Sequence, residues 1–265
     1  MGALEGIKLW TARRIAIIAL FTALELAFGF IAVPGMPGWT LESIPAFFCA
    51  AYFGLLEATI SFAIEMAISL GAIRAWAGVP PLIAAPSIIY NSAVVATMAV
   101  AYHYAYSVKK WKQPIPMIMG ILGRNIPSSF LITMLYLNAL TPRAGIPLLP
   151  LLLPIEWINN IIQAAIGFTA AELLLRARYR RFKIVGRPSI PPGFIQVELK
   201  SRPIPWLVST LVLGIIWWIL FISYWDEPPF TPIRIGIQWL LFIVFICLWM
   251  FGWEMWKKHI KYFIK

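Results

Sequence analysis

Long runs of apolar residues recur along the whole chain, and this recurrence limits its fold more than any other feature. A bilayer core about 30 Å thick is crossed by a helix of about 20 predominantly apolar residues, and the runs match that length. Only 12% of the 265 residues are Asp, Glu, Lys or Arg, against about a quarter in a soluble domain. The sequence therefore predicts an all-α integral membrane protein.

The apolar runs predict eight membrane-spanning helices. Their expected ranges are 12-33, 39-56, 57-76, 80-106, 114-139, 147-177, 205-225 and 233-256. The division between the second and third helices depends on one turn signal, Gly54 followed closely by Glu57, because 45-73 is otherwise nearly continuous apolar sequence. Without that turn the chain would have seven spanning helices.

The distribution of basic residues favours eight spans over seven. Lys and Arg concentrate in the cytoplasmic segments of membrane proteins. With the N-terminus in the cytoplasm, most of the 22 basic residues fall in four cytoplasmic segments, and both termini are cytoplasmic. The excess over 11 acidic residues is then a signal of orientation and gives no indication of nucleic-acid binding.

Composition divides the chain into three parts. Residues 1-178 hold six expected helices, residues 179-204 form a basic, Pro-rich cytoplasmic linker, and residues 205-265 form a two-helix extension. The extension contains eight of the 13 tryptophans, many of them near expected helix ends. Indole rings prefer the membrane interface, so lipid anchoring is the simplest interpretation of these residues.

The sequence predicts no catalytic residue, metal site or cofactor. Its two histidines, His103 and His259, are far apart, and it has no glycine-rich phosphate loop or nucleophile motif. Cys49 and Cys247 both lie within apolar runs and are interpreted as packing residues.

Polar residues within the expected spans are the remaining functional candidates, because a charge at the bilayer centre costs about 2.5 to 3.5 kcal/mol on insertion scales. In the sixth expected helix, the spacing i, i+3, i+4, i+7 places four of them on one face, with Trp157 beside them. The four are Glu156, Asn159, Asn160 and Gln163. Such groups can hold a polar ring compound by hydrogen bonds and stacking. A hydrogen-bonded seam between helices is the alternative.

The two preceding helices carry polar residues at a similar depth. They are Ser87, Tyr90 and Asn91 in the fourth expected helix, and Arg124, Asn125, Ser128, Ser129 and Thr133 in the fifth. Arg124 requires an anionic partner, for which Glu65 and Glu156 are the candidates, and either a structural ion pair or a ligand contact would satisfy it. Glu25 and Glu65 are alternatively proton-relay acids.

Three sequence patterns in residues 1-178 resemble an S component, the substrate-binding membrane subunit of energy-coupling factor (ECF) transporters. They are the stretch 12-24 with alanines at four-residue spacing, the stretch 44-58 with its tight turn, and Asn160 to Gly167 before a basic end. The resemblance implies a six-helix bundle that captures a vitamin or similar micronutrient from outside. It leaves the two-helix extension unexplained.

The resemblance also implies partners and residue roles. Ala19, Ala23 and Ala27 become candidates for docking a transmembrane coupling subunit, which two ABC ATPases drive, and the loop 34-38 becomes an external gate. The implied substrate-binding residues are Tyr90, Asn91, Arg124, Asn125, Glu156, Trp157, Asn159, Asn160 and Gln163. This mixture suits an aromatic heterocycle, cationic if Glu156 is ionised.

Under this interpretation, the chain imports a micronutrient across the cell membrane of a prokaryote, contacts lipid, and carries out no catalysis itself. A different class of function is also open: a non-transporting scaffold or assembly subunit of a membrane complex. In that case the polar stripe is a helix-packing seam and the Trp-rich helices are the partner surface.

Overall fold

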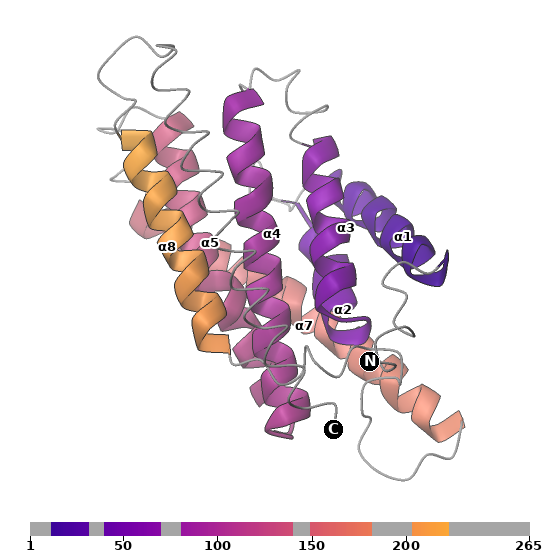
Figure 1. The fold of residues 1–265 in the computed structure, drawn as a ribbon. Helices are drawn as coiled ribbons and strands as arrows, with labels where there is room; N and C mark the ends of the chain where they lie inside the picture. The colour runs from indigo at the N-terminus through magenta and orange to yellow at the C-terminus, as the bar shows by residue number, and fades with distance from the viewer. Residues whose placement is uncertain (1–11, 32–39, 70–80, 140–148, 182–202, 223–265) are drawn as a thin grey trace, which may run out of the picture.

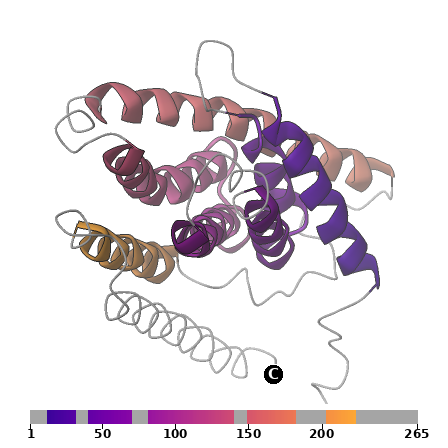
Figure 2. The same cartoon turned by 90° about the horizontal axis from the view of Figure 1, so that it is seen from above.

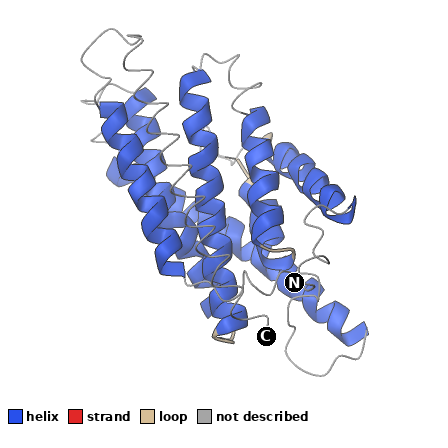
Figure 3. Ribbon diagram, viewed as in Figure 1, coloured by secondary structure: helices blue, strands red, loops and turns tan. Residues whose placement is uncertain are grey.

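The computed structural model describes residues 12–31, 40–69, 81–139, 149–181 and 203–222. All regular structure within these ranges is helical, with seven α-helices, one π-helical turn and no strand (Figure 3). The predicted all-α class is therefore confirmed. Three predicted features lie outside the described residues: the eighth helix at 233-256, the external loop 34-38, and most of the linker at 179-204.

In chain order the helices are α1 (Ala12–Gly29), α2 (Ser43–Tyr52), α3 (Leu55–Ile68), α4 (Pro81–His103), η3 (Tyr104–Val108), α5 (Ile115–Ala139), α7 (Leu149–Arg181) and α8 (Pro203–Ile222). The turn expected between the second and third helices is confirmed, because α2 and α3 are separated at Phe53 and Gly54. Gly54 has a φ of 120°, which residues with a Cβ rarely adopt.

Helix α2 is shorter than the sequence predicts. It contains 10 residues, or about 15 Å at 1.5 Å per residue, so the expected span 39-56 is wrong at both ends. At the C-terminal end, the backbone N–H groups of Phe53 and Gly54 both donate to the Cys49 carbonyl, at 2.8 and 3.1 Å, and close the helix. The apolar residues flanking α2 are in turns, which hydropathy alone does not distinguish from helix.

One described helical stretch, Leu153–Ala177, has both the length and the apolar composition to cross a membrane by itself. It belongs to α7, which contains the predicted polar stripe. Among the described residues, this stretch is the one that meets both criteria.

Contacts between helices fix their relative directions. Near the start of α1, Arg14 Nε pairs with Glu57 Oε1 of α3 at 2.7 Å, and further along both helices Thr22 Oγ1 donates to the Ser61 carbonyl at 3.2 Å. These two helices are therefore parallel. By the same reasoning α2 is parallel to α7, whereas α4 is antiparallel to α5. These relative directions are the ones expected when the successive helices of a chain alternate in direction.

The core lies where α2, α4 and α7 meet. The Tyr102 ring of α4 stacks on Phe168 of α7, with centroids 4.5 Å apart, and Phe168 packs edge-to-face against Phe47 of α2 at 5.1 Å. All three side chains are almost completely buried. Burial of rings of this size contributes most of the apolar area that holds such helices together.

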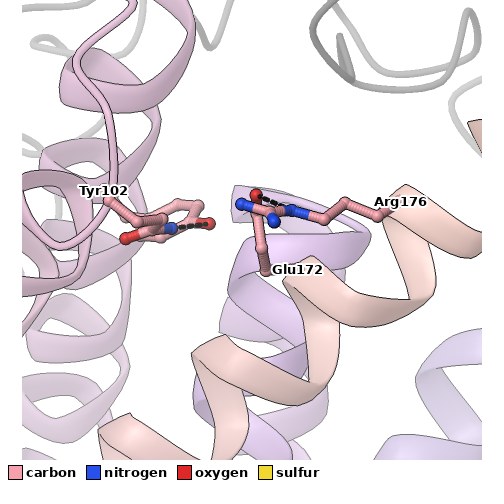
Figure 4. Close-up of polar contacts among 4 residues, drawn as sticks. Tyr102, Glu172 and Arg176 are labelled. Carbon is pink, nitrogen blue, oxygen red and sulfur yellow. Dashed lines mark hydrogen bonds and ion pairs between the residues drawn. The ribbon is translucent and has the colours of Figure 1, made fainter.

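The C-terminal end of α7 has a polar surface beyond this core. There Arg176 Nε pairs with Glu172 Oε1 at 2.9 Å, while Gln113 donates to the Tyr102 hydroxyl at 3.3 Å (Figure 4). The Arg176 side chain is 58% exposed, so this ion pair contributes little to stability. The ion pair lies where α7 changes from an apolar sequence to its basic C-terminal end.

Helix α8, the first helix of the expected extension, packs against α4 and α5 (Figures 1 and 2). The hydroxyl oxygens of Thr97 in α4 and Thr210 in α8 lie 2.8 Å apart, and both residues are 1% exposed. The beginning of the extension therefore shares a buried interface with the helices that precede the linker.

Candidate functional site

Arg124 of α5 is the centre of a buried polar network. The residue is 7% exposed, and its guanidinium carbon lies 5.4 Å from the centroid of the Phe47 ring and 5.7 Å from that of Phe62. Its Nε donates to the Asn160 side-chain oxygen at 3.3 Å, and a terminal nitrogen donates to the Ser43 hydroxyl. Two rings and two hydrogen-bond acceptors from α2, α3 and α7 thus hold one cation of α5.

Glu156 reaches this arginine through an amide. Asn160 donates from Nδ2 to Glu156 Oε1 at 2.9 Å while its oxygen accepts from Arg124. The sequence suggested Glu65 or Glu156 as the partner of Arg124, and the structure places an amide bridge between the arginine and Glu156.

Gln163 holds the beginning of α2. Its side-chain oxygen accepts the backbone N–H of Ser43 at 3.0 Å, and its nitrogen donates to the Thr40 carbonyl at 3.0 Å. The first backbone N–H groups of a helix have no intrahelical acceptor. Gln163 supplies one from another helix, and together with Arg124 it fixes Ser43 through both its backbone and its side chain.

Trp157 joins α7 to α5 at a second point. Its indole N–H donates to the Ser129 hydroxyl at 2.8 Å, and this hydroxyl donates to the backbone carbonyl of Asn125 at 2.8 Å. Asn125 is completely buried, and neither atom of its side-chain amide has a hydrogen-bond partner in the described part of the chain. A buried amide without partners is uncommon in folded proteins and suits a polar ligand or water.

The remaining predicted binding residues lie on the same three helices. The Tyr90 hydroxyl of α4 donates to the backbone carbonyl of Pro127, three residues beyond Arg124 in α5. Asn91 of α4 is half-buried, and Asn159 of α7 is buried. The structure thus links Arg124, Glu156, Asn160 and Gln163 into one network and gives Trp157 and Tyr90 separate contacts with α5.

Several members of the network were not predicted from the sequence. Ser43 and the Thr40 carbonyl precede or begin α2, and Phe47 and Phe62 flank the guanidinium. The polar residues before α2 have the pattern of a helix start, which carries no indication of a partner 120 residues away. The two phenylalanines are ordinary members of apolar runs, so no sequence signal distinguishes them.

A group of acids lies beside this network at the end of α1. Ser61 donates to Glu25 Oε1 at 3.1 Å, and Glu25 is completely buried. The carboxylates of Glu42 and Glu65 lie 3.6 and 4.0 Å from the point that a Cβ on Gly29 would occupy. Within the described residues, no group of three or more His, Cys, Asp or Glu side chains has an arrangement that could hold a metal ion.

The three predicted docking alanines, Ala19, Ala23 and Ala27, are all exposed on α1. The buried residues of α1, which include Phe21 and Glu25, lie on the opposite face of the helix. The small residues therefore form an outward surface of the described helices, as a docking face requires.

Comparisons with known proteins do not add a family assignment. No protein-family model matches the chain, and neither curated proteins nor solved structures give a significant match.

Replacing Gln163 with methionine is expected to lower the free energy of unfolding by about 2 kcal/mol. Methionine has a similar length but leaves the Ser43 N–H and the Thr40 carbonyl without their partner, and each unsatisfied buried group costs about 1 to 3 kcal/mol. The measurement is chemical unfolding of the purified protein in detergent micelles. The control is Ile162→Met, at a position 52% exposed on the same helix. Equal stability of the two variants would contradict the role given to Gln163.

Proposed function

We propose that the chain is the substrate-capture subunit of an ECF-type importer for a vitamin-like or other small micronutrient. The observation that carries the proposal is the network of Arg124, Asn160, Glu156 and Gln163, which joins α2, α5 and α7 inside the bundle. Buried ionisable groups at membrane depth are costly and are usually retained for binding or transport.

The chemistry of the network suits a polar ring compound. Glu156 offers carboxylate acceptors, the Asn125 amide offers both a donor and an acceptor, and Trp157 offers a ring face. Glu156 reaches Arg124 through Asn160 and not by a direct ion pair, so an ionised Glu156 carboxylate favours a ligand that carries positive charge. The ligand would replace contacts that the side chains now make with one another.

The relative directions of the described helices support a chain of alternating membrane spans. The parallel and antiparallel pairs have the directions that such alternation requires. The exposed alanines of α1 offer a surface on which the helix of a coupling subunit can pack closely. Energy for transport would come from ABC ATPases on other chains, and this chain would bind, reorient and release.

A scaffold subunit is the alternative from a different class. The observation favouring it is that Asn160, Gln163 and Trp157 all hydrogen-bond groups of neighbouring helices. Such bonds are also the ordinary means by which polar residues join membrane helices. In a scaffold, the whole network would be a seam that holds the bundle together.

Affinity purification of the tagged chain from its native membranes separates the two functions. Mass spectrometry would identify both the co-purifying polypeptides and any retained small molecule. We expect a coupling subunit, two ABC ATPases and one bound metabolite. Recovery of a different membrane assembly, without ATPases and without a metabolite, would establish the scaffold instead.

Replacing Glu156 with glutamine is expected to reduce the retained metabolite at least about tenfold, because a charge-assisted hydrogen bond to the ligand is lost. The amount retained per mole of purified protein is measured by mass spectrometry. Glu172→Gln is the matched control, since Glu172 is also in α7 but pairs with Arg176 at its far end. Unchanged retention in Glu156→Gln would remove this carboxylate from the site.

A further inference from the structure

The interface between α4 and α8 has two contacts at different levels along the helix axes, one formed by threonines and one by Tyr90. Tyr90 and Thr97 are seven residues apart on α4, and Gly214 and Thr210 are four residues apart on α8, so each pair lies on one face of its helix. Thr97 meets Thr210, and Tyr90 meets Gly214. The two helices are therefore antiparallel, and α8 lies along the α4 face that carries the predicted binding residue Tyr90.

The threonine level is a buried hydroxyl pair. Besides the 2.8 Å contact between Thr97 and Thr210, each hydroxyl approaches a carbonyl of its own helix, that of Ala93 at 2.9 Å and that of Trp206 at 2.8 Å. Each hydroxyl has one hydrogen, so only two of these three contacts are hydrogen bonds at one time. The pair fixes the register of α8 against α4.

The tyrosine level is a close steric contact. A Cβ on Gly214 would lie 3.0 Å from the Tyr90 hydroxyl oxygen and 3.2 Å from Cε2 of its ring. Glycine is thus the residue that lets α8 approach the tyrosine so closely. The backbone of α8 forms one wall of the space in which the Tyr90 ring sits.

The hydroxyl of Tyr90 contacts a segment of α5 in which the helical hydrogen bonding is incomplete. Pro127 has no N–H, so the carbonyl four residues earlier has no helical donor. Ser128 and Ser129 both donate to the Asn125 carbonyl, at 3.1 and 2.8 Å, and such bonds compete with helical ones. The conformation of this segment therefore depends on contacts from outside the helix, and the Tyr90 hydrogen bond to Pro127 is one of them.

We propose that α8 sets the conformation of the α5 segment carrying Arg124 and Asn125 through the contact of Gly214 with Tyr90 and of Tyr90 with Pro127. Tyr90 is then a positioning residue, and the C-terminal extension helps to shape the candidate site. The relevance of this coupling to transport rests on the proposed function. The coupling itself is a property of the bundle and can be measured without a ligand.

Hydrogen exchange of the full-length protein in lipid nanodiscs tests the coupling. In Gly214→Ala, the added methyl group displaces the Tyr90 ring, and in Tyr90→Phe the hydrogen bond to Pro127 is removed without a change of ring shape. We expect the α5 amides of residues 124–126, 128 and 129 to exchange at least about fivefold faster in each variant, the effect of losing one hydrogen bond. Amides of α1 and α3 should exchange as in the unchanged protein.

Two further variants sharpen the test. In the double variant Gly214→Ala with Tyr90→Phe, the rise in α5 should be no larger than in the stronger single variant, because both changes act through one contact. Val212→Ala, at a position 46% exposed on α8, is the control and should leave α5 unchanged. Unchanged exchange in α5 for both single variants, or a uniform rise in every helix, would overturn the proposal. Neither result depends on whether the chain transports a substrate.

Discussion

Gly167→Ala is expected to lower the free energy of unfolding by about 2 kcal/mol, although alanine is the better helix former by about 1 kcal/mol. The added Cβ would lie 2.7 Å from the Ile44 carbonyl oxygen and 3.1 Å from the Phe48 backbone nitrogen. Backbone atoms cannot rotate away, so α2 would have to move from α7. That movement would pull Ser43 from Gln163, which lies one turn before Gly167.

The measurement is the unfolding free energy in detergent micelles, and Gly29→Ala is the matched control. A Cβ at Gly29 would meet its nearest atom, Oε2 of Glu42, at 3.6 Å, an ordinary van der Waals distance. We expect the control to be as stable as the unchanged protein or slightly more stable. If Gly167→Ala matched that control, the close approach of α2 and α7 would be wrong.

Much of the fold follows from local patterns in the sequence. Apolar runs separated by charges and prolines define the helices, and the turn at Gly54 is detectable because a glycine and a charge interrupt a continuous run. The C-terminal end of α2 does not follow, because apolar residues continue past it at Phe53 and Leu55. Hydropathy reports the preference for an apolar environment, and turns buried in a bundle share that preference.

The candidate site was also predictable from the sequence only in part. The polar stripe of α7 is predictable because Glu156, Asn160 and Gln163 stand out from apolar neighbours at helical spacing. Their partners are not predictable, since the groups at Thr40 and Ser43 belong to a segment about 120 residues away. The contact of Tyr90 with Gly214 is missed for the same reason, because a glycine in an apolar run carries no mark of what it approaches.

Arg124→Met is expected to have the largest effect of any single change, a loss of about 3 to 5 kcal/mol in the free energy of unfolding. The guanidinium donates to Ser43 and to Asn160, and Asn160 donates in turn to Glu156. Its removal leaves the Ser43 hydroxyl and the Asn160 oxygen without this donor and removes the cation that Asn160 links to Glu156. Arg124→Lys should recover only part of the loss, because an ammonium group lacks the planar fork that reaches two acceptors while packing between rings.

Adding Glu156→Gln to Arg124→Met separates charge balance from packing. If the uncompensated carboxylate is the main cause of the loss, the double variant should be more stable than Arg124→Met alone, while Glu156→Gln alone should be destabilising because it disturbs an intact arrangement. Chemical unfolding of all four proteins in detergent micelles gives this comparison. Further destabilisation in the double variant would mean that Arg124 acts through shape and hydrogen bonding, and the role given to the Glu156 charge would be wrong.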